Sequence, residues 1–179
     1  MKSLKDRIQF AHQGGLVVRF HQHIGHRLNT DAQHSHGVAL MTLFLSDGLP
    51  SSNLLLAALT HDLAEQVIGD VPFPTKRNVP GLKKTLDEAE RDWLRLYDLD
   101  FPLTDEERKI LTLADSLDGM LYCASEAALG NRTLHVVYVK WLAVVEAATK
   151  TFTQEEVINA VIEIYEESCN GKTYDPINS

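Results

Sequence analysis

Cysteines and long apolar runs are scarce in this sequence. The two cysteines, Cys123 and Cys169, are too few for a disulfide framework and lack the paired spacing of metal ligands, so we expect two reduced thiols in a cytoplasmic protein. No run of about 18 apolar residues is present that would span a bilayer. Residues 1–7 are charged and lack the apolar segment of a signal peptide.

Basic residues are outnumbered by acidic ones. Seventeen Lys and Arg against 25 Asp and Glu give a net charge of −8, which argues against a broad surface for nucleic-acid polymers or anionic membranes. A small anionic ligand in a locally basic pocket is compatible with this charge. With 179 residues, the chain is long enough for one ordinary globular core. We expect a single domain over residues 1–170 and a frayed C-terminal tail over 171–179.

Apolar residues recur at helical spacing, and no stretch alternates as a half-buried strand does. The sequence therefore predicts an all-α fold, a single-domain helical bundle. Residues 71–81 contain three prolines and a glycine, so we expect a loop there that carries binding residues. The expected helices run from the N-terminus to Gly14 and over about 31–46, 53–69, 82–97, 104–129, 133–149 and 153–168.

An imidazole and a carboxylate lie side by side within the apolar helical run expected at 53–69. Burying an ionised Asp62 without a partner costs several kcal/mol, and the usual compensation is a hydrogen bond, an ion pair or a metal. In a continuous helix Glu65 follows His61 at i+4 and Asp62 at i+3, so the three side chains face one cavity, with Asp70 at its rim. For the dipeptide alone, an ordinary salt bridge or core hydrogen bond is the commoner explanation.

A second buried carboxylate is predicted at Asp115, in the apolar run 110–117 with no basic residue close by. Taken alone, a hydrogen-bonded aspartate and a metal ligand explain it equally well. Five of the eight histidines also cluster near the N-terminus, and His36 lies in the first turns of the helix expected at 31–46. Such clustering suggests a site, although His-rich loops also occur simply exposed. The clustered histidines are His21, His23, His26, His34 and His36.

The order His36, then His61-Asp62, then Asp115, each on a different helix, resembles the HD-domain phosphohydrolase superfamily. Its pattern is H…HD…D on a helical bundle that binds one or two divalent metals. Within it, the chain most resembles the 5'-deoxynucleotidases and the small phage-type deoxynucleotide phosphohydrolases. The segments that carry this likeness are Arg19–Phe20, Ala32–Ala39, His61–Glu65, Gly69–Lys76 and Leu113–Leu117.

The resemblance implies one divalent ion per chain. Two imidazoles and two carboxylates suit Co, Mn, Zn, Fe, Ni or Mg rather than a thiophilic ion. Glu65 and Asp70 would orient water or pass a proton, and a plain carboxylate on the helix face is the competing interpretation of Glu65. We expect His21, His23 and His34 not to be ligands. The implied metal ligands are His36, His61, Asp62 and Asp115.

The implied substrate contacts are Arg19, Phe20 and Lys76. Arg19 and Lys76 would clamp the phosphate, with a solvated surface role as the alternative. Phe20 would lie against the sugar or base and favour a deoxyribose. Two positions depart from the pattern: Phe20 stands where a larger indole is usual, and Thr112 stands where a lysine is common.

The resemblance implies a metal-dependent phosphohydrolase that converts a deoxynucleoside monophosphate to the deoxynucleoside and phosphate. The competing enzyme hypothesis is a triphosphohydrolase that releases tripolyphosphate from a deoxynucleoside triphosphate. Two hypotheses without catalysis are a nucleotide-binding sensor of HD type and a purely structural bundle. The expected partners are a small deoxynucleotide and further copies of the chain in a homo-oligomer, with neither a nucleic-acid polymer nor a membrane.

Overall fold

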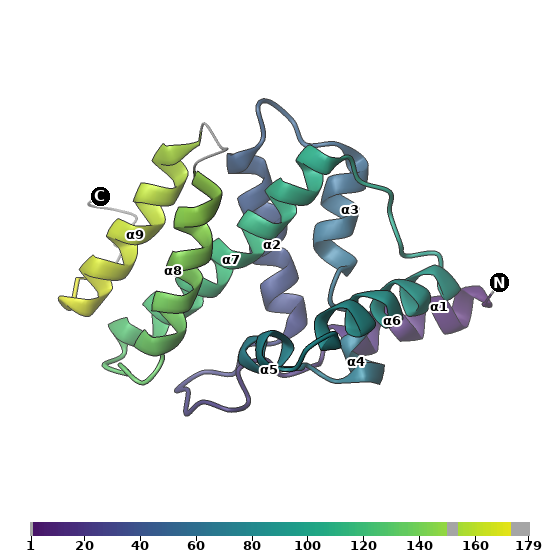
Figure 1. Ribbon diagram of the computed structural model, residues 1–179, viewed down its shortest axis with the longest axis horizontal. Helices are drawn as coiled ribbons and strands as arrows, with labels where there is room; N and C mark the ends of the chain where they lie inside the picture. The colour runs from purple at the N-terminus through teal and green to yellow at the C-terminus, as the bar shows by residue number, and fades with distance from the viewer. Residues whose placement is uncertain (1, 150–153, 173–179) are drawn as a thin grey trace.

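The computed structural model describes residues 2–149 and 154–172, and these residues confirm the all-α fold (Figure 1). Within these ranges no strand forms, and the only β-type pairing is an isolated antiparallel bridge between Val18 and Thr30. No described helix is both long and apolar enough to cross a membrane. The helices are α1 (Leu4–Gly14), α2 (Asp31–Leu45), α3 (Ser52–Thr60), α4 (Glu65–Ile68), α5 (Phe73–Asn78), α6 (Leu82–Leu96), α7 (Asp105–Ala128), α8 (His135–Thr149) and α9 (Glu155–Cys169).

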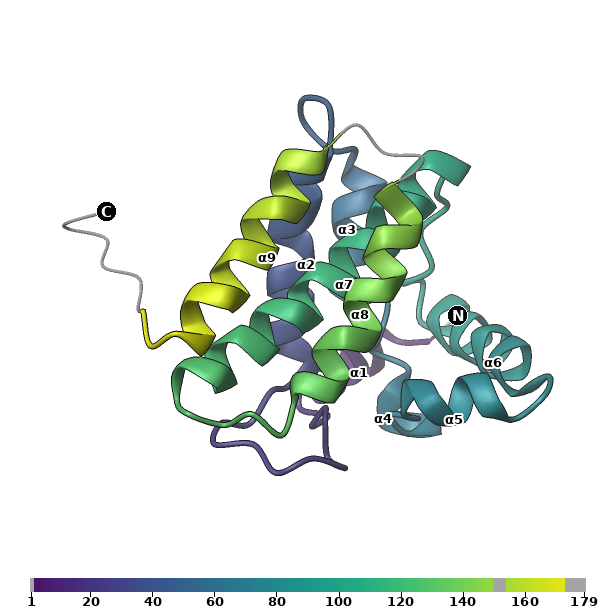
Figure 2. The ribbon, with the colours of Figure 1, turned by 60° about the vertical axis from the view of Figure 1, so that its left-hand side comes forward.

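The longest helix, α7, is the centre of the bundle and packs against α2, α8 and α9 (Figure 2). Its N-terminus has a capping box, in which Thr104 accepts from the Glu107 N–H and the Glu107 carboxylate accepts from the Thr104 N–H. Along α7, Leu113, Leu117 and Met120 are buried in the main core. Truncating such a side chain to alanine costs about 2–5 kcal/mol of stability.

A second, smaller apolar cluster joins α1, the turn after α3, and α6. Phe10, Leu63, Ala64 and Leu94 are buried in it. Gly14 allows α1 to approach closely, because a Cβ there would lie 2.6 Å from Leu63 Cδ2 and 2.9 Å from the Leu63 backbone. This cluster holds the segment that carries His61 and Asp62.

Two expectations for secondary structure are wrong. The helix predicted over 53–69 is broken: α3 ends at Thr60, and α4 begins at Glu65. Between them the N–H of residue 63 donates to the carbonyl of residue 60, and the N–H of residue 65 to that of residue 62, so the chain turns tightly. This turn packs the side chains of 63 and 64 into the smaller cluster, so tertiary packing overrides the helical pattern.

The loop expected at 71–81 contains the short helix α5. Its N-cap is Pro72, and a second proline lies in its first turn, where no backbone N–H is required. The other predicted helices agree with the structure to within a few residues, and Gly69 ends α4 with φ 85°. The predicted frayed tail lies outside the described residues except for residues 171 and 172.

Candidate metal centre and substrate cavity

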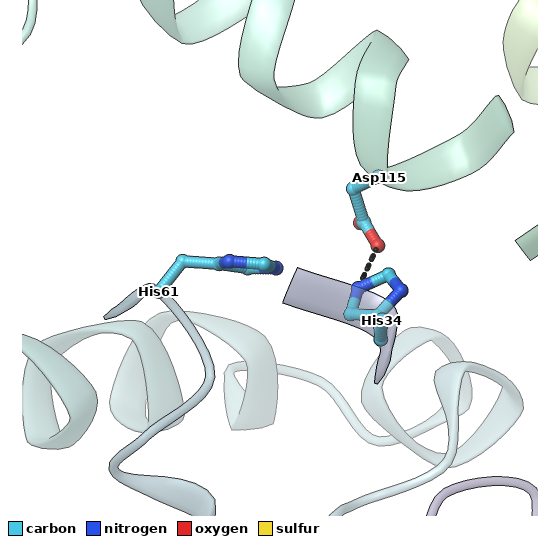
Figure 3. Close-up of side chains that lie close together, drawn as sticks. All are labelled: His34, His61 and Asp115. Carbon is cyan, nitrogen blue, oxygen red and sulfur yellow. Dashed lines mark ion pairs between the residues drawn. The ribbon is translucent and has the colours of Figure 1, made fainter. Parts of the chain in front are cut away.

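His34 projects from the first turns of α2 towards α7 and is only 2% exposed. Its Nδ1 donates to Asp118 Oδ2 over 2.6 Å, so Nε2 is the nitrogen that a metal would bind in place of a proton. That Nε2 is 3.1 Å from Asp115 Oδ1 (Figure 3), yet it has no partner of hydrogen-bond geometry among the described residues. A carboxylate that fixes the far nitrogen of an imidazole is typical of a histidine that binds a metal.

His61 stands at the C-terminus of α3 and has the same property. Its Nδ1 donates to the Ala58 carbonyl oxygen over 2.9 Å. Its Nε2 is buried and has no hydrogen-bond partner in the part of the chain that the structure describes. The rings of His34 and His61 lie with centroids 5.3 Å apart, so two free nitrogens point into one small space.

Carboxylates complete this group. Ligand atoms of His34, His61 and Asp115 lie within 4.8 Å of one another. Asp62 Oδ2 lies 3.6 Å from His34 Nε2 and 3.4 Å from His61 Nε2. Two neutral imidazole nitrogens and two carboxylates from α2, α7 and the end of α3 fit a divalent ion of borderline to hard character.

The carboxylates around His34 favour a positive charge in this group. Burial lowers the pKa of His34, but Asp115 and Asp118 outweigh this effect and raise the pKa to about 9. Burial raises the pKa of Asp62, whereas His61 and Arg19 bring it below its ordinary range. A proton on His34 and a divalent ion are therefore two ways to compensate the same carboxylates.

The structure does not bring His36 into this group. It is exposed, and its side chain has no hydrogen bond or ion pair to residues 2–149 or 154–172. Residues two positions apart on a helix are rotated by about 200° from each other, so His34 and His36 face nearly opposite directions. The signal was present in the sequence, because His34 shares one helical stripe with the buried Val38 and Leu45.

Arg19 lies among the carboxylates and is mostly buried. Its guanidinium pairs with Asp62, and it is 3.4 Å from Asp31 Oδ1 and 4.0 Å from Asp115 Oδ1. Burial disfavours the charged guanidinium, but the charges of Asp62 and Asp115 raise the pKa of Arg19. A solvated surface role for Arg19 is thus inconsistent with its position.

Glu65 and Lys76 meet on the next side of this charged cluster. Glu65 is 5% exposed, and burial followed by the charge of Asp62 raises its pKa to about 9. Lys76 Nζ lies 3.8 Å from Glu65 Oε1 and 3.7 Å from Glu90 Oε1. Asp70 Oδ2 lies 3.4 Å from His21 Nδ1. We call His34, His61, Asp62 and Asp115 the histidine group. The structure therefore gathers the predicted Arg19, Glu65, Asp70 and Lys76 near this group.

Sequence reasoning missed two carboxylates here. Asp118 orients His34, and the fully buried Asp31 lies with Asp62 and Glu65 in a second group of carboxylates within 4.8 Å of one another. Burial and then the charge of Asp62 raise the pKa of Asp31 to about 7. Asp31 directly follows the N-cap Thr30, in the first helical turn where acidic residues are common, so its position alone gives no sign of a site.

Comparison with known families agrees with this arrangement. The HD domain family matches residues 17–112, which is more than half of the chain. The chain belongs to the HD domain family. Its resemblance to HD-domain proteins is thereby confirmed.

Curated relatives of this HD domain are bacterial 5'-deoxynucleotidases. One from Photorhabdus laumondii is 29% identical over 106 residues, which cover 50% of this chain and 53% of the relative. 5'-deoxynucleotidase YfbR of Escherichia coli is 28% identical over 112 residues, or 54% of this chain and 56% of the relative. The match thus spans about half the length of these relatives.

Solved structures show the same fold over nearly the whole chain. An HD-domain phosphohydrolase from Listeria innocua is 19% identical with a TM-score of 0.76, covering 93% of this chain and 92% of that one. The HD phosphohydrolase of cyanophage S-2L, solved with dA and one catalytic Zn²⁺ ion, is 19% identical with a TM-score of 0.70, covering 93% and 98%. At these identities the likeness concerns the fold alone.

Phe20 of the HD domain is fixed by a part of α7 that sequence reasoning did not consider. Its backbone has φ 55°, which is unusual for a residue with a side chain. Its ring stacks on Tyr122 with centroids 4.7 Å apart and planes at 26°. The Tyr122 hydroxyl in turn donates to the Arg27 carbonyl over 2.9 Å. Tyr122 therefore supports both ends of the segment that carries Phe20.

Glu126, one helical turn further along α7, anchors the same segment. It is 0% exposed and accepts from the backbone N–H groups of His26 and Arg27 over 2.7 and 3.0 Å. The Asn131 side chain donates both to Glu126, over 2.7 Å, and to the Ile24 carbonyl, over 2.8 Å. A glutamate within the apolar stripe of α7 was the signal that could have revealed this anchor.

A cavity of about 360 Å³ opens beside the histidine group, a size suited to a small ligand. Asp62, Glu65 and Asp115 line one end of it. Its remaining walls come from the loop after Val18, from residues 70–72 and α5, and from α6, α7 and α8. The predicted site residues that line this cavity are Arg19, Phe20, Asp62, Glu65, Asp70, Lys76 and Asp115.

Proposed function

We propose that this HD domain is a metal-dependent phosphohydrolase that removes the phosphate of a deoxynucleoside 5'-monophosphate. The observation that carries the proposal is the pair of buried Nε2 atoms, on His34 and His61, that face two carboxylates beside a cavity with cations on its walls. Its curated relatives, which are named 5'-deoxynucleotidases, support the substrate class.

His34, His61, Asp62 and Asp115 would hold the ion, with His34 in the place for which the sequence suggested His36. A divalent ion at such a site polarises a phosphoryl oxygen and lowers the pKa of water. Asp118 and the Ala58 carbonyl keep the two imidazoles in the tautomers that leave Nε2 free. The chain thus supplies an organised set of ligands before any substrate arrives.

Glu65 would hold and move a proton. Its raised pKa keeps the carboxyl protonated at neutral pH, and its Oε2 is buried without a hydrogen-bond partner among the described residues. A group in that state beside the cavity can donate to the leaving oxygen of a phosphate ester. Asp70, which pairs with His21, is the second candidate for orienting water.

The distribution of basic side chains supports a monophosphate. Lys76 Nζ lies 3.7 Å from Glu90 Oε1, and Lys83 pairs with Asp87 over 2.5 Å. Thr112 uses its hydroxyl to donate to the Arg108 carbonyl of its own helix. A triphosphate carries several more negative charges than a monophosphate, so an acidic cavity with mostly neutralised cations suits the smaller anion.

The test is a hydrolysis panel with the chain loaded in turn with Mn²⁺, Co²⁺, Zn²⁺, Ni²⁺ and Mg²⁺. Deoxynucleoside mono- and triphosphates and their ribose counterparts are supplied, and the phosphorus product is identified by ³¹P NMR. We expect orthophosphate from the deoxynucleoside monophosphate. Tripolyphosphate from the triphosphate, with the monophosphate untouched, would overturn the proposed substrate. Tight nucleotide binding without any turnover would instead identify a sensor.

A further inference from the structure

One wall of the cavity comes from α8, which lies beyond the matched residues 17–112, and it is apolar apart from Lys140. Val137, Trp141 and Val144 line it. Their spacing of i, i+4 and i+7 places them on one face of the helix, so α8 presents a continuous apolar stripe to the cavity.

Gly119 of α7 lets the Trp141 indole pack close to the metal centre. A Cβ on Gly119 would lie 3.0 Å from Trp141 Nε1 and 3.2 Å from Cε2, so the indole rests directly on the backbone of α7. Gly119 follows Asp115 by four residues, and both therefore lie on one side of α7, about one helical turn apart. The indole is thus positioned about one turn from a metal-ligand candidate.

Phe73 faces this indole from α5. The two ring centroids are 5.8 Å apart, and the ring planes are inclined by 33°. Phe73 is 38% exposed, although it lines the cavity together with Lys76, three residues later on the same helix. We call the pair Phe73 and Trp141 the aromatic corner. Since its rings are inclined and too close to enclose a third ring, a planar ligand would stack on its open side.

We propose that the aromatic corner binds the nucleobase of the substrate. The proposal rests on the phosphohydrolase function above, and it adds the residues that bind the other end of the nucleotide. With the phosphate at the histidine group and the sugar beside Phe20, the base is the remaining planar, apolar part, and the aromatic corner is the aromatic wall of the same cavity.

The chemistry of the aromatic corner also predicts which bases bind. Stacking on an aromatic face tolerates any base, because every base has a π-face. Lys140, the neighbour of Trp141 in the chain, also lines the cavity; its ammonium group only donates, and every base has an acceptor for it. The HD domain should therefore accept all four bases, with purines bound more tightly because they cover more of the indole.

The experiment uses Trp141→Ala and Trp141→Phe, with Val139→Ala as the matched control. Val139 is an exposed apolar residue of the same helix that does not line the cavity. For each variant, kcat and KM are measured on dAMP and on 2-deoxyribose 5-phosphate, which has no base. We expect Trp141→Ala to reduce the kcat/KM advantage of dAMP over the sugar phosphate by about tenfold, mostly through KM. Trp141→Phe should restore part of it, and Val139→Ala should leave it unchanged.

An equal loss on both substrates, or no loss on either, would overturn the base site.

Fluorescence separates a failure of the base site from a failure of the proposed function. In a Trp93→Phe background Trp141 is the remaining indole, and dAMP that stacks on it should quench its emission. Quenching without hydrolysis would leave the base site standing and refute the phosphohydrolase. Hydrolysis without quenching would support the phosphohydrolase and refute the base site.

Discussion

The histidine group and the segment that carries Phe20, here called the Phe20 wall, face the same cavity but are held in place by different kinds of contact. His34 and Asp115 project from α2 and α7, whose inner faces form the main core. Phe20 lies in an irregular segment that is held by side chains of α7. If the proposed function holds, the chemistry is placed on a rigid frame, whereas substrate selectivity depends on a few long-range hydrogen bonds and one ring contact.

The largest effect should come from the ligands themselves. Asp62→Ala should abolish both stoichiometric metal binding and hydrolysis, because it removes a carboxylate and leaves Arg19 without its closest partner. His34→Ala should lose the metal as well, whereas His36→Ala, on the opposite face of α2, should retain it. Elemental analysis of the purified variants is the measurement. Full metal content in His34→Ala would contradict this ligand set.

Glu65→Ala should keep the metal and lower kcat by ~10² or more, the usual scale for a lost acid or base. Glu65→Gln is the matched control, since it keeps the shape and the hydrogen-bonding capacity but cannot ionise. Metal content and kcat are measured together. Loss of the metal from Glu65→Ala would mean that Glu65 is a ligand rather than a proton carrier.

A smaller effect is expected behind His34. Asp118→Asn should weaken metal binding by about 10–100-fold, because Asp118 fixes the tautomer of His34. Gly37→Ala is an independent route to the same outcome, since a Cβ at this position would clash with Asp118 Oδ1. Competition with a chelator gives the affinity, and an unchanged affinity in both variants would remove Asp118 from the site.

The Phe20 wall should respond in selectivity rather than in metal content. Tyr122→Leu removes the ring behind Phe20, a contact worth about 0.5–1.5 kcal/mol, so the preference for dAMP over AMP should fall ~2- to 10-fold. Tyr122→Phe keeps the ring and loses only the bond to Arg27, so it should retain most of the preference. Equal rates of the unmodified protein on dAMP and AMP would refute the role of Phe20.

The smallest expected effect is on stability at acid pH. Burial raises the pKa of Glu126, but hydrogen bonds from the His26 N–H, Asn131 and the Arg27 N–H bring it below the ordinary value. A carboxyl with a lowered folded-state pKa stabilises the fold above its unfolded pKa, and this stability is lost as pH falls through the folded value. Urea unfolding between about pH 5 and pH 3 should therefore show a shallower acid loss in Glu126→Gln than in the unmodified chain.

Much of the fold could be predicted because its signals are local. The capping box of Thr104 and Glu107 joins residues three apart, and the Thr30 cap of α2 does the same with Gln33. Short-range hydrogen bonds and helical periodicity can be read from any such segment without knowledge of its neighbours. The all-α class and the pattern of a histidine, a His-Asp pair and a later aspartate were therefore determined by the sequence itself.

Only the tertiary structure decided which histidine faces the site and where the helix after residue 52 ends. His34 meets Asp118 across 84 positions in the chain, and Glu126 meets His26 across 100. The break after Thr60 depends on the packing of Leu63 against the first helix. Contacts between residues so far apart in the chain form only when the elements that carry them pack together, so local propensity carries little information about them.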